Sequence, residues 1–278
     1  MSYVARPQDG VAWVSSASTG LGRAVALALA DHGWTVAATG RNPVDLETLV
    51  AACADCSGKI VAYPGDLTKG GIVAQIVKRI ESKHGPIVLA ILAPSEDEAT
   101  PAGVLTREML DEALSASFVS VTNALLPLMP AMRERKQGQI AMLSSFTGYR
   151  GLPGARGTGA AKAALKNLAE GLYPDLAVDG VRLQVVTVGM LGTPAPGTHA
   201  LARSMHISVD AAAERVISGL KRSSRFEVAF PRRLIWPLRL AGALPDAIYF
   251  ALSRRMRAKE PRAKPARSAR RVTRTPIA

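Results

Sequence analysis

The sequence predicts a doubly wound α/β fold, in which helices cover both faces of a parallel sheet of about seven strands. Two observations lead to this prediction. Short apolar runs alternate along the chain with longer segments whose apolar residues recur at helical spacing. The first such unit, from Val11 to Arg41, also has a turn of small residues at its first strand-to-helix corner.

Within this unit, the apolar run Val11–Val14 is the first predicted strand and Trp34–Ala38 is the second. Between them, helical spacing continues through Ala30, and His32-Gly33 ends the helix. The later elements follow the same alternation. Further strands are predicted over 58–64, 87–93, 138–143, 181–188 and 227–230.

Further helices are predicted over 43–52, 106–133 and 209–220, and two more end at His84 and Val178. The helix over 106–133 is expected to bend at Pro127 and Pro130.

The turn at the first corner has the chemistry of a phosphate site. The start of a helix presents unpaired backbone N–H groups and a partial positive charge, which suit a pyrophosphate. Glycine lets the backbone approach the phosphate closely, and hydroxyl groups add donors. The residues concerned are Ser15, Ser18, Thr19, Gly20, Leu21 and Gly22. The alternative is a tight turn that binds nothing.

Arg41 lies just after the second predicted strand, beyond Thr39 and Gly40. In dinucleotide-binding folds, an acidic residue here holds the adenosine ribose, whereas a basic residue suits a 2′-phosphate. Arg41 therefore predicts NADP rather than NAD as the cofactor.

From about Val11 to about Phe230, the chain resembles the short-chain dehydrogenase/reductase (SDR) family of the common soluble type. The resemblance implies a Rossmann-type sheet and a nicotinamide cofactor. The family turn reads TGxxxGIG, and here Ser15-Ser16 precedes Gly20-Leu21-Gly22, so Ser16 replaces the first glycine. This replacement is tolerable only if Ser16 does not need a positive φ.

The resemblance also implies further cofactor contacts. Asp66-Leu67 matches the pair that cradles the adenine, although Asp66 could instead cap the helix that follows. Where the family reads NNAG, the chain has Ile91-Leu92-Ala93-Pro94, so of the implied contacts only Ala93 stays in place. Where the family reads PGxxxT, Gly189 and Thr193 are kept.

The catalytic positions are only partly kept. Ser145 matches the serine that hydrogen-bonds the substrate carbonyl, and Lys162 matches the lysine that also holds the nicotinamide ribose. The family tyrosine, four residues before that lysine, is replaced by Thr158. The helix asparagine falls at Leu114, or at Ser115 after a one-residue slip. Tyr149 is an alternative proton donor. Two hypotheses follow, an oxidoreductase with impaired or atypical hydride transfer and a dinucleotide-binding or scaffold protein without catalysis.

The positive charge is concentrated after the SDR-like part. Of 35 Lys and Arg residues, ten lie in 253–278 beside one Glu, while residues 1–219 are close to neutral. Three parts are predicted, namely the SDR-like domain 1–230, two amphipathic helices in 231–257 split at Leu244-Pro245, and a disordered tail 258–278. The amphipathic part is either a contact for an anionic membrane or a lid or dimer arm packed on the body. Without interleaved aromatics, the tail indicates no specific nucleic-acid site.

No signal peptide is expected before the SDR-like domain, and Cys53 and Cys56 are expected to be two reduced thiols, as in a cytoplasmic protein. No metal site is expected. The segment 190–208 is expected to form a flexible loop over an unknown small-molecule substrate. The resemblance implies a homo-oligomer paired through long helices.

Overall fold

The computed structural model describes residues 3–94, 105–192, 206–222 and 225–257. Within them, seven strands form one sheet in which all neighbouring strands are parallel. In sheet order, they are β3 (Lys59–Ala62), β2 (Thr35–Ala38), β1 (Val11–Val14), β4 (Ile87–Leu92), β5 (Gly138–Ser145), β6 (Val181–Val188) and β9 (Glu227–Phe230). The strand order reverses between β1 and β4, which is where doubly wound folds bind ligands. The predicted fold is confirmed.

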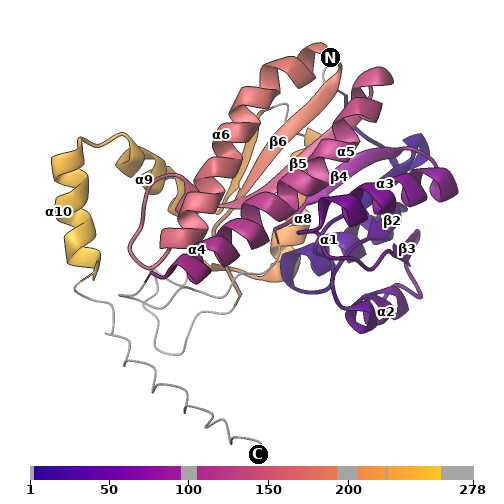
Figure 1. The fold of residues 1–278 in the computed structure, drawn as a ribbon, viewed down its shortest axis with the longest axis horizontal. Coiled ribbons are helices and arrows are strands. Elements are labelled where there is room, and N and C mark those ends of the chain that lie inside the picture. The colour runs from indigo at the N-terminus through magenta and orange to yellow at the C-terminus, as the bar shows by residue number, and fades with distance from the viewer. Residues whose placement is uncertain (1–2, 95–104, 193–205, 223–224, 258–278) are drawn as a thin grey trace, which may run out of the picture.

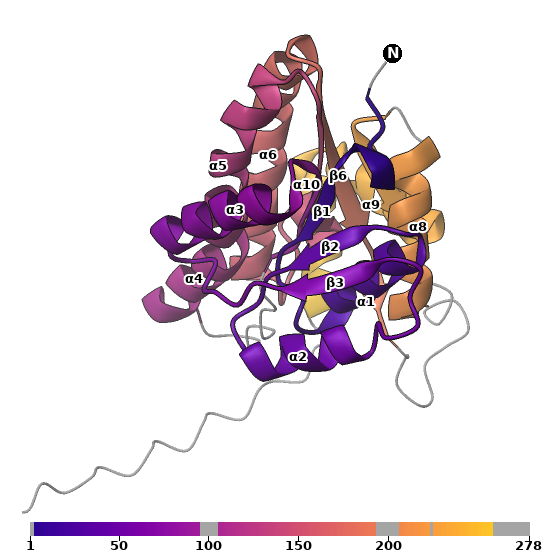
Figure 2. The ribbon, with the colours of Figure 1, turned by 90° about the vertical axis from the view of Figure 1, so that its right-hand side faces the viewer.

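Helices cover both faces of this sheet (Figure 2). On one face lie α1 (Gly20–Asp31), α2 (Pro43–Ala51) and α8 (Val209–Arg222). On the other face lie α3 (Gly70–His84), α4 (Arg107–Ala113), α5 (Ser120–Glu134) and α6 (Arg156–Val178). Each face has its own buried apolar core, because strands buried on both sides carry apolar residues at nearly every position.

A π-helical turn, Leu114–Val119, joins α4 to α5. The predicted cap at the start of α4 is present, because Thr106 Oγ1 accepts a hydrogen bond from the Met109 N–H at 3.2 Å. By length and composition alone, the helical stretch Arg107–Glu134 is apolar enough to cross a membrane, and it is the one such helix in the described part of the chain. Its buried face packs in the core under the sheet, as expected of a core helix.

Beyond the sheet, the chain continues as α9 (Arg232–Gly242) and α10 (Asp246–Arg257). The break between them falls at the predicted position, Leu244-Pro245. In Figure 1, α9 leads away from the sheet and α10 lies beyond it at the side of the molecule. We call residues 231–257 the C-terminal arm. Two short strands, β7 (Met190–Leu191) and β8 (His206–Ile207), pair beside the end of β6.

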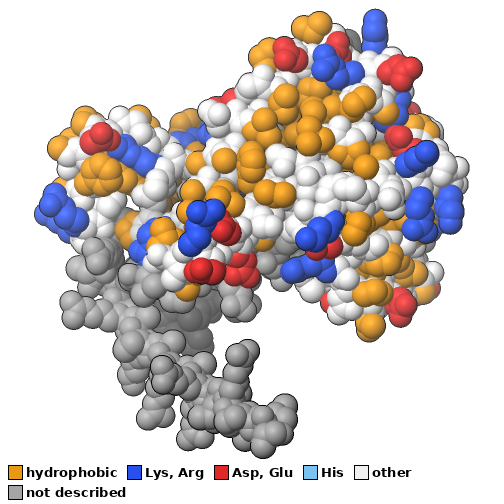
Figure 3. All heavy atoms as spheres, viewed as in Figure 1, with side chains coloured by type: hydrophobic (Ala, Val, Ile, Leu, Met, Phe, Trp, Pro, Cys, Tyr) orange, Lys and Arg blue, Asp and Glu red, His pale blue; other side chains and the backbone are white. Residues whose placement is uncertain are grey.

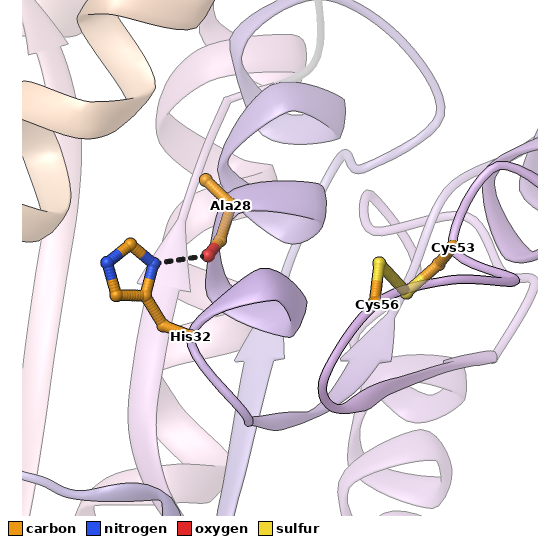
Figure 4. Close-up of a disulfide and its surroundings, with 4 residues drawn as sticks. All are labelled: Ala28, His32, Cys53 and Cys56. Carbon is orange, nitrogen blue, oxygen red and sulfur yellow. Dashed lines mark hydrogen bonds between the residues drawn. A yellow bond between two sulfur atoms is a disulfide. The ribbon is translucent and has the colours of Figure 1, made fainter.

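Cys53 and Cys56 form a disulfide in the turn after α2 (Figure 4). The turn brings their Cα atoms to 5.0 Å, within the reach of a disulfide, and the Cys56 N–H donates to the Cys53 carbonyl. The expectation of two reduced thiols was therefore wrong. The thiols consequently give no support to a reducing compartment.

Candidate functional site

The turn between β1 and α1 is shaped by close backbone approach at the carboxyl end of the sheet. A Cβ on Gly22 would lie 2.3 Å from the Ser16 carbonyl oxygen, so only glycine fits where α1 begins. Ser16 has a φ of 49°, and Gly20 has a φ of 55°. A positive φ costs a non-glycine residue about 1–2 kcal/mol. The condition placed on Ser16 is therefore not met, because the turn does hold this serine in the left-handed region.

Two hydroxyl groups in this turn are buried without a hydrogen-bond partner among the described residues. They are Ser16 Oγ and Ser18 Oγ. Thr19, the N-cap residue of α1, makes no side-chain capping bond in this part of the chain. Buried polar groups are nearly always hydrogen-bonded, so these groups point to a polar ligand at the helix start.

Ser15 has a different role from the one expected. Its side chain is buried, and its hydroxyl donates to the Ala93 carbonyl at 2.9 Å. This bond ties the end of β1 to the end of β4, so the hydroxyl supports the cleft wall and does not donate into the cleft. Ala93 in turn contributes to the wall where the strand order reverses.

A cleft of about 240 Å³ opens beside the turn, at the ends of β1 and β2. Its lining includes Ser18, Thr19, Gly40, Arg41 and Leu67. Among the described residues, no carboxylate lies within ion-pair distance of Arg41. The guanidinium at the cleft wall is therefore available to an anionic ligand.

Asp66 lies just before this cleft's apolar wall at Leu67. Its carboxylate accepts hydrogen bonds from the Thr68 N–H at 2.9 Å and the Thr68 hydroxyl at 2.8 Å. The backbone bond from Thr68 is the main reason that the pKa of Asp66 lies below its ordinary value. The N-cap of α3 is Lys69, so Asp66 fixes the turn before the helix and does not cap the helix itself.

A second cleft, of about 410 Å³, continues from the first and shares Ser16 and Thr19 with it. It runs along the carboxyl ends of β1, β4, β5 and β6. Its polar and small lining residues include the predicted positions Gly22, Ala93, Ser145, Thr158, Lys162 and Gly189, and Leu21 also lines it. The structure therefore brings most of the predicted cofactor and catalytic positions to one continuous depression.

Ser145, Thr158 and Lys162 lie together in this second cleft. Ser145 ends β5, and its hydroxyl oxygen accepts a hydrogen bond from the Thr147 N–H at 3.4 Å. Thr158 and Lys162 are one helical turn apart on α6, so both side chains lie on the same face of the helix. Lys162 is only 8% exposed.

Comparison with known proteins identifies the family. The family model described as short chain dehydrogenase matches residues 10–202. The chain belongs to the short-chain dehydrogenase family. An uncharacterized oxidoreductase of Myxococcus xanthus (strain DK1622) is 30% identical over 246 residues, which cover 88% of this chain and 97% of that protein.

Two solved structures share the SDR fold at low sequence identity. A short-chain dehydrogenase from Streptomyces avermitilis has a TM-score of 0.73 and 23% identity, covering 90% of this chain and 98% of its own. The NADPH-bound structure of a short chain oxidoreductase from Pseudomonas aeruginosa PAO1, which contains an atypical catalytic center, has a TM-score of 0.70 and 21% identity. That match covers 80% of this chain and 95% of the other.

The partner of the SDR lysine was missed in the sequence. Lys162 Nζ donates to Ser117 Oγ at 3.1 Å, and Ser117 is fully buried in the π-helical turn. Leu114 and Ser115, the two positions counted for the helix asparagine, lie earlier in the same turn. No motif in the sequence distinguishes Ser117 from Ser115 and Ser120 on the same helical stretch.

Tyr149, the alternative proton donor, is held away from this role. Its hydroxyl donates to Glu227 Oε1 at 2.5 Å, and Arg239 Nε donates to the same hydroxyl at 3.3 Å. Burial, together with the bond to Glu227, raises the pKa of Tyr149 to about 12. A tyrosine that serves as an acid near neutral pH needs a pKa shifted the other way.

Some predicted features lie outside the described residues. They are Thr193, most of the expected loop over the substrate within 190–208, and the tail 258–278. Gly189 is described, and its N–H donates to the Phe230 carbonyl at 2.9 Å, which fixes the floor of the cleft. Within the described ranges, no group of three or more His, Cys, Asp or Glu side chains could hold a metal ion.

Proposed function

We propose that this SDR is an NADP(H)-binding, oxidoreductase-like protein in which proton delivery to the substrate is impaired. The observation that carries the proposal is the continuous cleft, which joins the cofactor turn and Arg41 at one end to Ser145, Thr158 and Lys162 at the other. The substrate class is a carbonyl compound or the corresponding alcohol.

The residues at the β1–α1 end of the cleft fit a dinucleotide. Ser16 Oγ and Ser18 Oγ are buried and lack partners in the described part of the chain, and the first turn of α1 offers backbone N–H groups. Gly22 leaves room for close backbone approach. These groups would hold the pyrophosphate.

Arg41 supports a preference for NADP(H) over NAD(H). The guanidinium lines the cleft beside Gly40, at the end of β2, where a basic residue matches a 2′-phosphate. The P. aeruginosa relative was solved with NADPH and an atypical catalytic center, which supports cofactor binding in this fold when catalytic residues differ.

When bound, the reduced nicotinamide would supply a hydride. The Ser145 hydroxyl would hydrogen-bond the substrate carbonyl, and Lys162 would hold the nicotinamide ribose. Thr158 can donate a hydrogen bond, but an aliphatic hydroxyl does not release its proton near neutral pH. General acid catalysis contributes about 10²–10⁴-fold to a rate, so we expect a turnover lower than that of a tyrosine-containing SDR by about this factor.

A second function is a protein that binds NADP(H) without turnover. The engagement of Tyr149 by Glu227 and Arg239 favours it, because this tyrosine is then not a substitute acid. The two functions share the cofactor site and differ only in hydride transfer to a carbonyl substrate.

The cofactor site is tested by titrating NADPH and NADH into the purified protein and following nicotinamide fluorescence. We expect NADPH to bind more tightly than NADH. Arg41→Ala should weaken the binding of NADPH by about 10–100-fold and leave the binding of NADH unchanged, since a hydrogen bond to a charged group contributes about 1.5–3 kcal/mol. Lys78→Ala, an exposed change on α3, is the control. Absence of binding by either cofactor at millimolar concentration would refute both functions.

A further inference from the structure

The C-terminal arm is fastened to the loop that follows Ser145. Arg150 donates hydrogen bonds to the carbonyl oxygens of Ala241, Gly242 and Leu244 at 3.1, 3.0 and 2.7 Å, at the end of α9. The same guanidinium pairs with Asp246 at 2.5 Å, at the start of α10. One arginine therefore neutralises the carbonyl end of one helix and holds the acidic start of the next.

Two further contacts orient the arm. The Arg150 guanidinium lies 3.9 Å from the centre of the Tyr249 ring, and the Tyr249 hydroxyl donates to the Gly151 carbonyl at 2.5 Å. Arg239 of α9 also pairs with the half-buried Glu227 of β9. These contacts use the inward sides of both helices and leave their outward sides to another partner.

The outward sides carry large apolar residues. Trp236 is 58% exposed, Leu240 is 64% exposed and Phe250 is 55% exposed, and Ile248 and Leu252 are also exposed. Trp236 and Leu240 are four residues apart on α9, and Ile248 and Leu252 are four apart on α10, so each pair lies on one helix face. Phe250 lies on the other flank of α10, since Tyr249 between it and Ile248 faces inward. In Figure 3, apolar and basic side chains lie together on the part of the molecule where Figure 1 places α10.

The free charge of the arm is entirely positive. Arg232, Arg233, Arg254 and Arg255 form no ion pair with another described residue, whereas the one acid of the arm, Asp246, is paired with Arg150. The sequence that follows, 258–278, adds seven basic residues and one acid. A partner of this surface must therefore accept large apolar side chains and carry negative charge.

We propose that the C-terminal arm binds the surface of an anionic lipid bilayer, with its apolar side chains inserted at the headgroup boundary and its arginines on lipid phosphates. Amphipathic helices with aromatic and aliphatic residues beside arginine bind in this way. Nucleic acid would match the charge but not the exposed aliphatic groups. A second copy of this chain is disfavoured as the partner, because it would bring two positively charged arms together. This inference goes beyond the proposed function and does not depend on it.

Trp236 provides a direct probe of insertion. The chain has three tryptophans, of which Trp13 and Trp34 are buried in the core. The full-length protein is mixed with vesicles of phosphatidylcholine alone or with phosphatidylglycerol added. We expect co-sedimentation and a blue shift of tryptophan emission only with the anionic vesicles. Trp236→Phe should abolish the shift while leaving most of the binding.

Variants separate the arm from the tail. Leu240→Ser with Phe250→Ser should lower vesicle binding at least tenfold, and each arginine changed to glutamine at 233 or 254 should lower it about fivefold. The matched controls are Val44→Ser, Val178→Ser and Lys78→Gln, which are exposed elsewhere and should bind as the unchanged protein does.

Three outcomes would overturn the proposal. The first is no binding to anionic vesicles. The second is binding that survives the arm substitutions but is lost when residues 258–278 are deleted, which would assign it to tail charge alone. The third is a blue shift that depends on protein concentration without vesicles, which would assign the surface to a second copy. Cofactor titration of the same samples reports on the proposed function independently.

Discussion

Gly40→Ala tests the packing that shapes the cofactor cleft. A Cβ at this position would lie 1.9 Å from Ser18 Oγ and 3.1 Å from Ser18 Cβ. Rotation of the Ser18 side chain can move Oγ away, but the approach to Ser18 Cβ remains, so the turn between β1 and α1 must also shift slightly. Overpacking of this kind costs about 1–3 kcal/mol in the free energy of unfolding. With a urea slope of about 2–3 kcal/mol per molar, the midpoint should fall by roughly 0.5–1 M.

A double-mutant cycle with Ser18→Gly isolates this overlap. Ser18→Gly removes both Oγ and Cβ of Ser18, at a cost of up to about 1 kcal/mol from added freedom in the unfolded chain. The double variant should therefore be no less stable than Ser18→Gly alone, with a coupling of about 1–3 kcal/mol in the cycle. Urea unfolding and NADPH titration measure the two effects.

Gly171→Ala is the control for this cycle, because no atom lies within 4 Å of its added Cβ inside α6. It should stabilise the protein by about 0.5–1 kcal/mol. A Gly40→Ala protein with unchanged stability and unchanged NADPH affinity would refute the steric reasoning.

Three further predictions concern the turn and the C-terminal arm. Ser16→Gly should raise the free energy of unfolding by about 1 kcal/mol in urea, because it relieves a φ of 49°. Arg150→Ala should speed limited trypsin cleavage in the arm at least tenfold, whereas the exposed Arg107→Ala should not. Burial alone would raise the pKa of Glu227, but bonded hydroxyls and nearby cations lower it overall. The stabilisation by the Glu227 carboxylate is thus present above about pH 4.5, the ordinary value, and is lost as the pH falls further. Glu227→Gln should remove this pH dependence, measured by urea unfolding across the same pH range.

The order of strands and helices could be predicted from the sequence, because each element shows itself in the apolar spacing of its own segment. The unit Val11–Arg41 gave β1, α1 and β2 with small errors at their ends. The short edge strand Glu227–Phe230 was also predicted correctly, although it pairs with a strand about 40 residues earlier in the chain.

The details of the site depended on geometry that the sequence does not state. Whether Ser16 takes a positive φ is decided by the approach of Gly22 to its carbonyl, which only the folded turn shows. No partner of Lys162 was predicted, because a residue count cannot locate the π-helical turn that presents Ser117 to the lysine.

Contacts between distant segments likewise could not be predicted from the sequence. The sequence indicates a loop tyrosine near Ser145 at position 149, and the partner of Tyr149, Glu227, lies 78 residues away on the edge strand. Arg150 reaches carbonyl groups more than 90 residues further along the chain. No periodicity or motif couples such positions, so the sequence left open whether the C-terminal arm packs on the body.

We propose that Thr158, in place of the family tyrosine, limits proton delivery in an SDR that still binds NADP(H). This is measured by NADPH oxidation at saturating cofactor, over a panel of simple carbonyl compounds, for the unchanged protein, Thr158→Tyr and Thr158→Phe. We expect Thr158→Tyr to raise turnover by about 10²-fold or more and Thr158→Phe not to raise it, since only the phenol adds an acid next to Lys162. An unchanged protein that turns over as fast as Thr158→Tyr would contradict it.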